Sequence, residues 1–288
     1  MDELEKNIAP QQTPSTLHAA GNGEKDPEEA PSLTLKNRNY WTWRAASYSE
    51  GNRSELAGSL HRRWKEELLS HIARTWRSTA DAALHVLDVG TGPGFFAIIL
   101  AEAGFRVTAI DVTPSMLAEA RKNAGPLAEK ICFMEMDAQE PAFSAHSFDV
   151  VVSRNVTWNL PRPRQAYEAW LRLLKPGGLL LNFDANWYRY LFDEKALQGY
   201  CQDRANSARR GVRDPNIGKG YDVMEDIARR VPLSRELRPQ WDLDVFRSLG
   251  VPAECDTQVW QRVWTDDEKL SFASTPLFLV AAKKPHAR

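Results

Sequence analysis

Residues 85–96 run His85-Val86-Leu87-Asp88-Val89-Gly90-Thr91-Gly92-Pro93-Gly94-Phe95-Phe96 and join an apolar segment to a glycine-rich turn and a second apolar segment. This order predicts a strand that ends in a tight turn and opens a helix. Glycine lets a ligand approach the backbone closely, and the first turn of a helix offers N–H groups without helical partners. The segment therefore predicts a nucleotide-like ligand at this turn.

The spacing of the glycines distinguishes between two kinds of ligand. A dinucleotide turn follows Gly-x-Gly-x-x-Gly, but here the third glycine, Gly94, comes one residue early and Phe95 takes its place. Asp88 lies just before the turn, where its charge would repel a pyrophosphate. We therefore expect a ligand that carries an amine.

Short apolar segments alternate with helix-like segments from residue 84 onward. This alternation is typical of a parallel sheet whose strands are joined by crossover helices. Lys175-Pro176-Gly177-Gly178 predicts a tight turn into the last strand of the series. The predicted strands are residues 84–89, 106–110, 131–136, 148–153 and 179–183, and the predicted helices are residues 95–103, 114–123 and 164–174.

The two ends of the chain follow other patterns. Residues 1–36 are polar and lack an apolar period, which predicts a disordered tail. Residues 37–80 combine an aromatic N-terminal lid segment with a helix capped by Ser54, because apolar side chains recur there at every fourth residue. These side chains are Leu60, Trp64, Leu68, Ile72 and Trp76. Residues 81–185 are the predicted core, residues 186–239 an inserted helical substrate lid, and residues 240–288 a last helix (241–249) with two closing strands (254–263 and 276–282).

The composition restricts the class of protein and its partners. The formal net charge of −1 gives no general attraction to nucleic acid. Cys132, Cys201 and Cys255 are far apart and show no Cys-x-x-Cys spacing, which predicts buried or incidental thiols and no metal site. The acidic N-terminus and the absence of a long apolar segment predict a soluble, cytoplasmic protein without a membrane span.

The glycine turn and the acids after the next two predicted strands resemble the class I S-adenosylmethionine-dependent methyltransferase family, small-molecule type. The resemblance begins near Tyr40 and is most specific between Leu84 and Gly178, where several motifs occur in register. It implies a Rossmann-like α/β fold: a doubly wound, mostly parallel seven-stranded sheet with helices on both faces and a helical lid after the fifth strand. It also implies that S-adenosylmethionine binds at the turn through Asp88, Gly90, Thr91, Gly92 and Gly94, with Asp88 facing the methionine amine.

Further cofactor contacts are expected at the ends of the predicted strands. Asp111 can accept hydrogen bonds from both ribose hydroxyls, and it can also cap the helix that begins at Pro114. For Asp137 a solvated loop acid is the alternative, and for Met116 a place in the core. The resemblance implies contacts from Asp137 and Ala138 to the adenine edge, from Val112 and Met116 to the adenine ring, and from Arg154 and Asn155 near the methyl group.

The aromatic run Tyr40-Trp41-Thr42-Trp43 and Arg44 resembles the N-terminal segment that folds over the cofactor in small-molecule methyltransferases. A guanidinium can hold a carboxylate through two parallel hydrogen bonds, so Arg44 is a candidate for the methionine carboxylate, with Tyr40 beside it. The alternative is that these rings pack under the long helix.

Methyl transfer from a sulfonium requires an in-line nucleophile and the exclusion of water, and it needs neither a catalytic triad nor a metal. Open α/β sheets bind ligands at the carboxyl ends of their strands, so acceptor residues are expected after the fourth and fifth strands. Asp184 is the candidate general base, with a structural acid bonded to the lid as the alternative. The other candidates are Asn155, Trp158, Asn159, Asn186 and Trp187.

The expected partner is a small, flat or amphipathic methyl acceptor, because aromatic residues dominate the predicted lid. The lid also carries an arginine cluster, Arg204, Arg209, Arg210 and Arg213, but no basic stripe or motif of a nucleic-acid-binding protein accompanies it. The sequence leaves open the accepting atom and the oligomeric state. Two other functions stay open: a non-catalytic S-adenosylmethionine-binding protein and a nicotinamide-dependent oxidoreductase.

Overall fold

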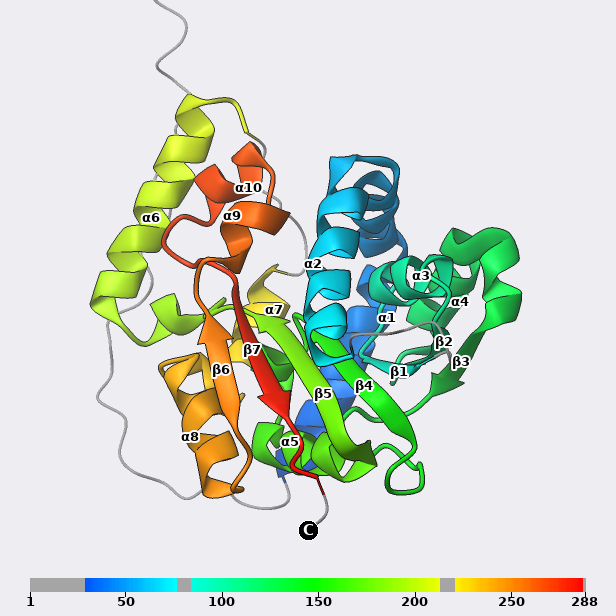
Figure 1. The fold of residues 1–288 in the computed structure, drawn as a ribbon. Coiled ribbons are helices and arrows are strands. Elements are labelled where there is room, and N and C mark those ends of the chain that lie inside the picture. The colour runs from blue at the N-terminus through cyan, green and yellow to red at the C-terminus, as the bar shows by residue number, and fades with distance from the viewer. Residues whose placement is uncertain (1–28, 77–83, 213–220, 287–288) are drawn as a thin grey trace, which may run out of the picture.

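A seven-stranded sheet forms the centre of the protein in the computed structural model, which describes residues 29–76, 84–212 and 221–286 (Figure 1). The strand order is β3-β2-β1-β4-β5-β7-β6, and only β7 runs antiparallel to its neighbours among the described strands. This is the predicted doubly wound, mostly parallel arrangement. The strands are β1 (His85–Val89), β2 (Arg106–Asp111), β3 (Ile131–Glu135), β4 (Phe148–Arg154), β5 (Leu174–Asp184), β6 (Ala253–Asp256) and β7 (Phe278–Lys283).

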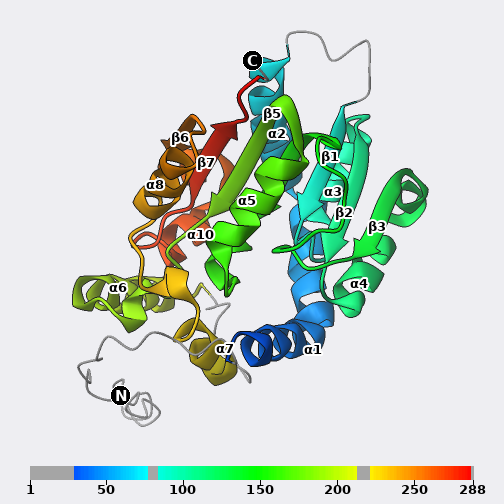
Figure 2. The same ribbon diagram turned by 90° about the horizontal axis from the view of Figure 1, so that it is seen from below.

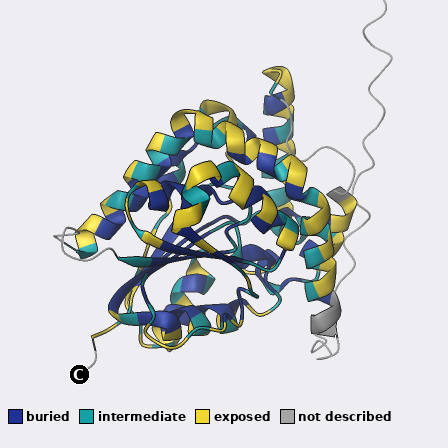
Figure 3. Ribbon diagram, turned by 90° about the vertical axis from the view of Figure 1, so that its right-hand side faces the viewer, coloured by how far each residue is buried: buried dark blue, intermediate teal, exposed yellow. Residues whose placement is uncertain are grey.

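Helices cover both faces of the sheet (Figures 1 and 2). Successive side chains of a strand point to opposite faces, so Val86 joins one core cluster and Leu87 the other. One face packs against α2 (Ser59–Thr75), α3 (Phe95–Glu102), α4 (Pro114–Ala124) and α9 (Val259–Val263), and the other against α5 (Pro163–Leu173) and α8 (Gln240–Ser248). Figure 3 shows the result, a buried sheet between helices whose outer sides are exposed.

The N-terminal helix α1 (Glu29–Ala57) corrects two predictions. Residues 29–36 were expected in a disordered tail, but they belong to this helix; residues 1–28 lie outside the described part of the chain. Leu33 is buried against Met224 and Ile227, which lie about 190 residues later, so no local apolar period could reveal it. Ser54 does not cap α2, because it lies inside α1, where its hydroxyl donates to the carbonyl oxygen of Glu50 (3.1 Å).

The segment between β5 and α8, residues 186–239, is called the insertion below. Its predicted helices are present: η3 (Arg189–Leu191), α6 (Glu194–Arg209), α7 (Tyr221–Ala228) and η4 (Pro232–Ser234). Asp193 caps α6, since its side chain accepts a hydrogen bond from the amide of Ala196 (2.8 Å). In Figure 2, α6 and α7 lie beyond one end of the sheet, and α7 lies next to the start of α1.

The C-terminal region differs from the prediction in one element. Residues 254–263 were expected to form a strand, but β6 ends at Asp256 and the rest folds into α9, followed by α10 (Asp266–Ser271). Val259 and Val263 are four residues apart and both fully buried, which suits a short helix rather than a strand. Residues 175–178, the predicted turn, lie within β5, although Gly177 has the expected positive φ of 77°.

Two further observations concern the whole chain. All three cysteines are exposed free thiols, so of the two expected alternatives, buried or incidental, the buried one does not hold. Among the helices of the described residues, none combines the length and the apolar character that crossing a membrane requires.

Candidate functional site

The glycine turn between β1 and α3 has a backbone that requires glycine. Gly90, Gly92 and Gly94 have φ angles of 63°, 52° and 93°, in the region that L residues rarely adopt. A Cβ on Gly90 would also lie 2.5 Å from Cγ2 of Val156, and one on Gly94 would lie 3.0 Å from Cβ of Ala120. The turn thus brings bare backbone to the carboxyl end of β1, while Gly94 serves the packing of α3 on α4.

Asp88 lies below the turn and is buried. Its Oδ2 accepts hydrogen bonds from the hydroxyl of Thr91 (2.6 Å) and from the amide of Ala97 (3.0 Å). Burial is the main cause that raises the pKa of Asp88 to about 7. Neither Asp88 nor Thr91 lines the cavities described below, so the structure does not support the expected contact between Asp88 and a ligand amine. Both residues hold the turn on α3 instead.

Asp111 ends β2 and faces the turn. Its Oδ2 accepts a hydrogen bond from the amide of Gly92 (3.0 Å), and its Oδ1 accepts one from the amide of Thr113 (2.9 Å). Burial raises the pKa of Asp111, and the two amide contacts act in the opposite direction. Asp111 does not cap α4 as predicted, because it accepts from the amide of Thr113, which is itself the N-cap residue, and no side chain caps this helix. The carboxylate also lines a cavity.

That cavity, called the turn cavity here, has a volume of about 120 Å³ and lies at the carboxyl ends of β1, β2 and β4. Asp137 is held at its edge, where Oδ1 accepts a hydrogen bond from the amide of Gln139 (2.8 Å). The indole of Trp170 donates to the carbonyl oxygen of Ala138 (2.7 Å) and fixes the same loop. The cavity is lined by eight of the predicted cofactor residues: Gly90, Gly92, Asp111, Val112, Met116, Asp137, Ala138 and Arg154. Tyr48, Trp41 and Asn155 are among its other lining residues.

A second and larger cavity, about 720 Å³, lies beside the first between α1, the insertion and α10. We call it the aromatic cavity. Trp158 stacks on Tyr188 with ring centroids 5.0 Å apart, and Tyr190 stacks on Tyr200 at 4.2 Å. Its walls include Trp41, Tyr48, Trp64, Trp158, Trp187, Tyr188, Tyr190, Tyr200, Trp264 and Phe272, together with Tyr40 and Arg44.

Four residues line both cavities: Trp41, Tyr48, Arg154 and Asn155. Arg154 is the last residue of β4 and pairs with Glu55 of α1 (Nη1 to Oε2, 2.8 Å). Its guanidinium carbon lies 4.3 Å from the ring centroid of Phe95. Burial raises the pKa of Tyr48, so its phenol stays protonated at neutral pH. The cavities therefore meet at a cation, a phenol and an amide.

Asn155 occupies a special position at this junction. Its φ of 59° is left-handed, a region in which asparagine is enriched several-fold over most other residues. Its backbone N–H donates to the carbonyl oxygen of Phe183 (2.8 Å), and its backbone carbonyl oxygen accepts from the indole of Trp158 (3.0 Å). The side-chain Oδ1 is buried and has no hydrogen-bond partner among the described residues. A buried acceptor without a partner is costly, which suits a group that binds a ligand.

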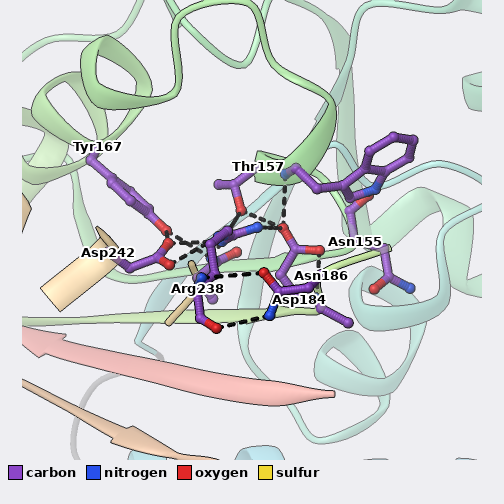
Figure 4. Close-up of polar contacts among 10 residues, drawn as sticks. Asn155, Thr157, Tyr167, Asp184, Asn186, Arg238 and Asp242 are labelled. Carbon is purple, nitrogen blue, oxygen red and sulfur yellow. Dashed lines mark hydrogen bonds and ion pairs between the residues drawn. The ribbon is translucent and has the colours of Figure 1, made fainter. Parts of the chain in front are cut away.

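Asp184 does not serve as the predicted base in this structure. Its carboxylate is fully buried and forms an ion pair with Arg238 of the insertion (Nη1 to Oδ2, 2.6 Å). The same Oδ2 accepts from the hydroxyl of Thr157 (2.5 Å) and from the amide of Trp158 (2.8 Å), as Figure 4 shows. Asp184 lines neither cavity, so it is the structural acid bonded to the insertion that was the alternative.

The remaining acceptor candidates separate into two groups. Trp158 and Trp187 line the aromatic cavity, and the indole nitrogen of Trp187 is buried without a partner among the described residues. Asn186 instead exchanges two hydrogen bonds with the backbone of Arg238, and Asn159 bonds to Asn37 of α1 and lines only the turn cavity. These two amides tie the insertion and α1 to the sheet.

Tyr40 and Arg44 lie on α1 and line the aromatic cavity rather than the turn cavity. Of the arginine cluster, Arg204 also lines the aromatic cavity and stands over the rings of Tyr200 (5.1 Å) and Phe272 (5.4 Å). Arg209 and Arg210 lie exposed at the end of α6, and Arg213 lies outside the described residues.

Sequence reasoning missed Glu55 and Glu268, two acids of the aromatic cavity. Nothing in the sequence near Glu55 connects it with Arg154, which follows 99 residues later. The pattern Thr265-x-x-Glu268 was a readable signal, because threonine followed three residues later by glutamate is typical of a helix start.

Comparison with known proteins identifies the family. Residues 87–182 match the family described as "Methyltransferase domain". The chain is 33% identical over 218 residues to the ubiquinone/menaquinone biosynthesis C-methyltransferase UbiE of Roseobacter denitrificans, covering 72% of this chain and 83% of that protein. The chain belongs to the class I S-adenosylmethionine-dependent methyltransferases. The methyltransferase thus uses S-adenosylmethionine as its methyl donor.

Other comparisons agree with this family and with its Rossmann-like fold. The enzyme of the same name from Agrobacterium fabrum is 33% identical over 131 residues. This match covers 44% of the present chain and about half (49%) of that relative. The structure of the plantazolicin methyltransferase BpumL, in complex with a triazolic desmethylPZN analog and S-adenosylhomocysteine, has a TM-score of 0.57 at 14% identity. The match covers 90% of this chain and 99% of that one, and at this identity it supports the fold alone.

The residues of the methyltransferase fit this cofactor. The bare backbone at Gly90 and Gly92 leaves room for a ligand above β1, and Asp111 presents a half-buried carboxylate beside it. Asn155, whose Oδ1 has no hydrogen-bond partner among the described residues, and the cation of Arg154 line both the turn cavity and the aromatic cavity. The carboxylate of Asp111 suits the hydroxyl groups of a sugar, and the side chains of Asn155 and Arg154 suit the amine and carboxylate of an amino acid.

Proposed function

We propose that this methyltransferase transfers a methyl group to a small molecule bound in the aromatic cavity. One observation carries the proposal: the aromatic cavity and the turn cavity share a wall that includes Tyr48, Arg154 and Asn155. An in-line displacement requires the nucleophile and the donated methyl group to face each other across a short gap. Two adjoining cavities with a shared wall provide this arrangement.

In this proposal the turn cavity holds the nucleoside. Asp111 accepts hydrogen bonds from the ribose hydroxyls, and Val112 and Met116 lie against the adenine ring. Asp137 accepts from the exocyclic amine of adenine, and the backbone amide of Ala138 meets a ring nitrogen. Gly90 and Gly92 allow close approach of the ligand, while Thr91, Gly94 and Asp88 support the turn from behind.

The methionine end extends toward the junction. We propose that Arg154, Arg44 and Tyr40 surround it there, because Arg154 lines both cavities and the other two line the aromatic cavity. Arg44 has a buried Nε without a partner among the described residues, which leaves that N–H available to a carboxylate. Asp88 bonds to Thr91 and Ala97 below the turn, so its role is to hold the backbone of the turn in the shape that receives the ligand, without contacting the ligand itself.

S-adenosylmethionine supplies an electrophilic methyl group when it is bound, because the methyl carbon is attached to a positively charged sulfur. The contribution of the chain is positioning and the exclusion of water. Trp158 and Tyr188 form a stacked wall for the acceptor, and Asn155 offers an amide oxygen at the junction. An unpaired carboxylate beside sulfur would favour the ground state, and Glu55 at the junction is paired with Arg154.

The acceptor that the cavity suits is planar and amphipathic. Stacked rings line its walls, while hydroxyl, guanidinium and carboxylate groups interrupt them, so a flat ring with polar substituents can be bound on several sides. The Roseobacter relative is named for ubiquinone/menaquinone biosynthesis and C-methylation. We therefore propose a hydroxylated, quinol-like ring as the first acceptor class to test.

Two binding measurements and one transfer assay test the proposed function. Isothermal titration should give micromolar binding of S-adenosylhomocysteine and no binding of NAD. Methyl transfer from isotopically labelled S-adenosylmethionine into a metabolite extract, and into a hydroquinone panel, should produce a labelled small molecule. Binding without any transfer would support the alternative of a non-catalytic cofactor-binding protein, and binding of NAD alone would exclude both.

A further inference from the structure

The aromatic cavity contains four acids, and the proposed function needs one that can accept a proton. Glu50 and Glu55 come from α1, Asp203 from α6 and Glu268 from α10. Since Asp184 is bonded to Arg238 outside the cavity, the proton acceptor must be sought among these four if the acceptor atom carries a proton.

Three of these acids are unsuited to the task. Glu55 is occupied by its ion pair with Arg154 (2.8 Å). Asp203 accepts two hydrogen bonds at Oδ2 from Ser274, one from the backbone amide (2.8 Å) and one from the hydroxyl (2.6 Å). Glu50 is exposed to solvent, so water competes with a ligand for its carboxylate.

Glu268 is held through one oxygen, as Asp203 is, but its side chain is only partly buried, whereas Asp203 is buried and exposes little of its carboxylate. It is the third residue of α10 and closes a capping box with Thr265. Both hydrogen bonds that it accepts, from the amide (2.7 Å) and the hydroxyl (2.9 Å) of Thr265, go to Oε2. Its Oε1 accepts no hydrogen bond from any described residue, and the side chain lines the aromatic cavity with Trp264 and Phe272. One oxygen therefore fixes the carboxylate while the other remains available.

The electrostatic surroundings favour a proton acceptor at this place. Burial raises the pKa of Glu268 above its ordinary value, and the charge of Glu55 on α1 adds to this effect. The two hydrogen bonds from Thr265 lower the pKa of Glu268, as does the charge of Arg154 at the end of β4. On α6, which packs against α10, Arg204 donates to the carbonyl oxygen of Ser271 and Asp203 is bonded to Ser274.

We propose that Glu268 is the general base of the methyl transfer, with Oε1 accepting the proton of the acceptor atom. This inference rests on the proposed function. In the step, a bond forms between the acceptor atom and the methyl carbon, and the electron pair of the carbon–sulfur bond moves to sulfur. The proton of the acceptor atom moves to Glu268 and later exchanges with water, so charge and atoms balance without another reactant.

The proposal restricts the acceptor. It must present an atom that carries a proton at the moment of attack, as a hydroxyl group, an amine or an activated ring carbon does. A thioether or a tertiary amine, which has no proton to lose, would gain nothing from this carboxylate. The aromatic neighbours Trp264 and Phe272 are placed to hold the ring that bears the reacting atom.

The variant Glu268→Gln tests the proposal without removing the helix cap. Glutamine is accepted at the third position of a capping box, so α10 keeps its start while the base is lost. Glu50→Gln, in the same cavity, is the matched control. The probe is methyl-labelled S-adenosylmethionine with the metabolite extract, measured from pH 5 to pH 9, and the affinity for S-adenosylhomocysteine is measured by calorimetry on the same proteins.

We expect Glu268→Gln to bind S-adenosylhomocysteine within about threefold of the wild-type chain and to transfer label at least about 100-fold more slowly. The wild-type rate should rise with pH through the pKa of Glu268 and then level off, and the variant should lose this rise. Equal rates and equal pH profiles in wild type and Glu268→Gln would overturn the proposal alone. If the wild-type chain binds S-adenosylhomocysteine but labels nothing, the proposed function fails and the assignment of Glu268 fails with it.

Discussion

Replacing Arg238 by methionine should strongly destabilise the protein, because the guanidinium holds together a fully buried network. It donates to Oδ2 of Asp184 (2.6 Å), to both carboxylate oxygens of Asp242 (2.7 and 2.9 Å) and to the hydroxyl of Thr157 (2.8 Å). Arg238, Asp184 and Asp242 have no exposed side-chain surface. Figure 4 shows the network between the insertion and the ends of β4 and β5.

The magnitude follows from what the substitution leaves behind. Asp184 keeps hydrogen bonds from Thr157, Trp158 and Ala185, whereas Asp242 keeps only the bond from the phenol of Tyr167. Removing one partner of a buried ion pair costs about 3–5 kcal/mol, since the remaining charge stays buried without compensation. At roughly 2–4 °C per kcal/mol for chains of this size, the melting temperature should fall by about 6–20 °C.

Urea unfolding followed by circular dichroism measures this loss, with Arg62→Met as the control. Arg62 forms an exposed pair with Glu66 on α2, and such pairs contribute about 0–1 kcal/mol. The double variant Arg238→Met/Asp242→Asn should recover part of the loss, because it removes the carboxylate that has fewer remaining partners. A loss below 1 kcal/mol for Arg238→Met, or no recovery in the double variant, would refute the reasoning.

Three other predictions test the site and the turn. Asp111→Ala should weaken the binding of S-adenosylhomocysteine by about 1–3 kcal/mol, or roughly 5- to 150-fold, because it removes a half-buried charged acceptor. Unchanged affinity in a folded variant would contradict the ribose placement, and Glu135→Ala, at the end of β3, is the calorimetric control. Gly90→Ala should lower the free energy of unfolding by about 1–3 kcal/mol, because the new Cβ would lie 2.5 Å from Cγ2 of Val156 and the backbone φ of 63° is strained for alanine. Urea unfolding should show that the double variant Gly90→Ala/Val156→Ala regains part of the lost stability. Asp88 has a folded-state pKa of about 7, above its ordinary 3.8, so between these pH values the folded chain binds more protons than the unfolded chain and the free energy of unfolding falls as pH rises. Asp88→Asn should remove this fall between pH 4 and pH 7 in denaturant titrations. An identical pH dependence in both proteins would count against the assignment.

Much of the fold was predictable because its signals are local. The five strands from β1 to β5 and the helices α3, α4 and α5 match the predicted segments to within one or two residues, except that β5 begins five residues early. Buried parallel strands are short apolar segments, and the turns between them carry glycine or proline at fixed positions. The glycine turn itself was readable for the same reason, since positive φ angles at Gly90, Gly92 and Gly94 admit few other residues.

Helices that depend on distant partners were not predictable in the same way. The first turns of α1 are polar, and Leu33 finds its apolar partners only in α7. The short helices α9 and α10 are below the length at which an apolar period can be distinguished from that of a strand. Tertiary packing decides such elements, because their own sequence does not supply enough buried surface.

The residues at the candidate site divide along the same line. By itself the sequence determined the fold class and the family, and it pointed to those residues of the turn cavity that lie at strand ends, such as Gly90 and Asp111. The folded chain adds Trp41 and Tyr48 from α1 to the wall of that cavity. Only the tertiary structure decided which acids face the aromatic cavity. Asp184 stands at a strand end as predicted, yet Arg238 from the insertion binds it 54 residues later, and Glu268 reaches the cavity from a helix near the C-terminus. The physical reason is that the role of a carboxylate depends on the charges and hydrogen-bond donors around it, and these come from segments that only the folded chain brings together.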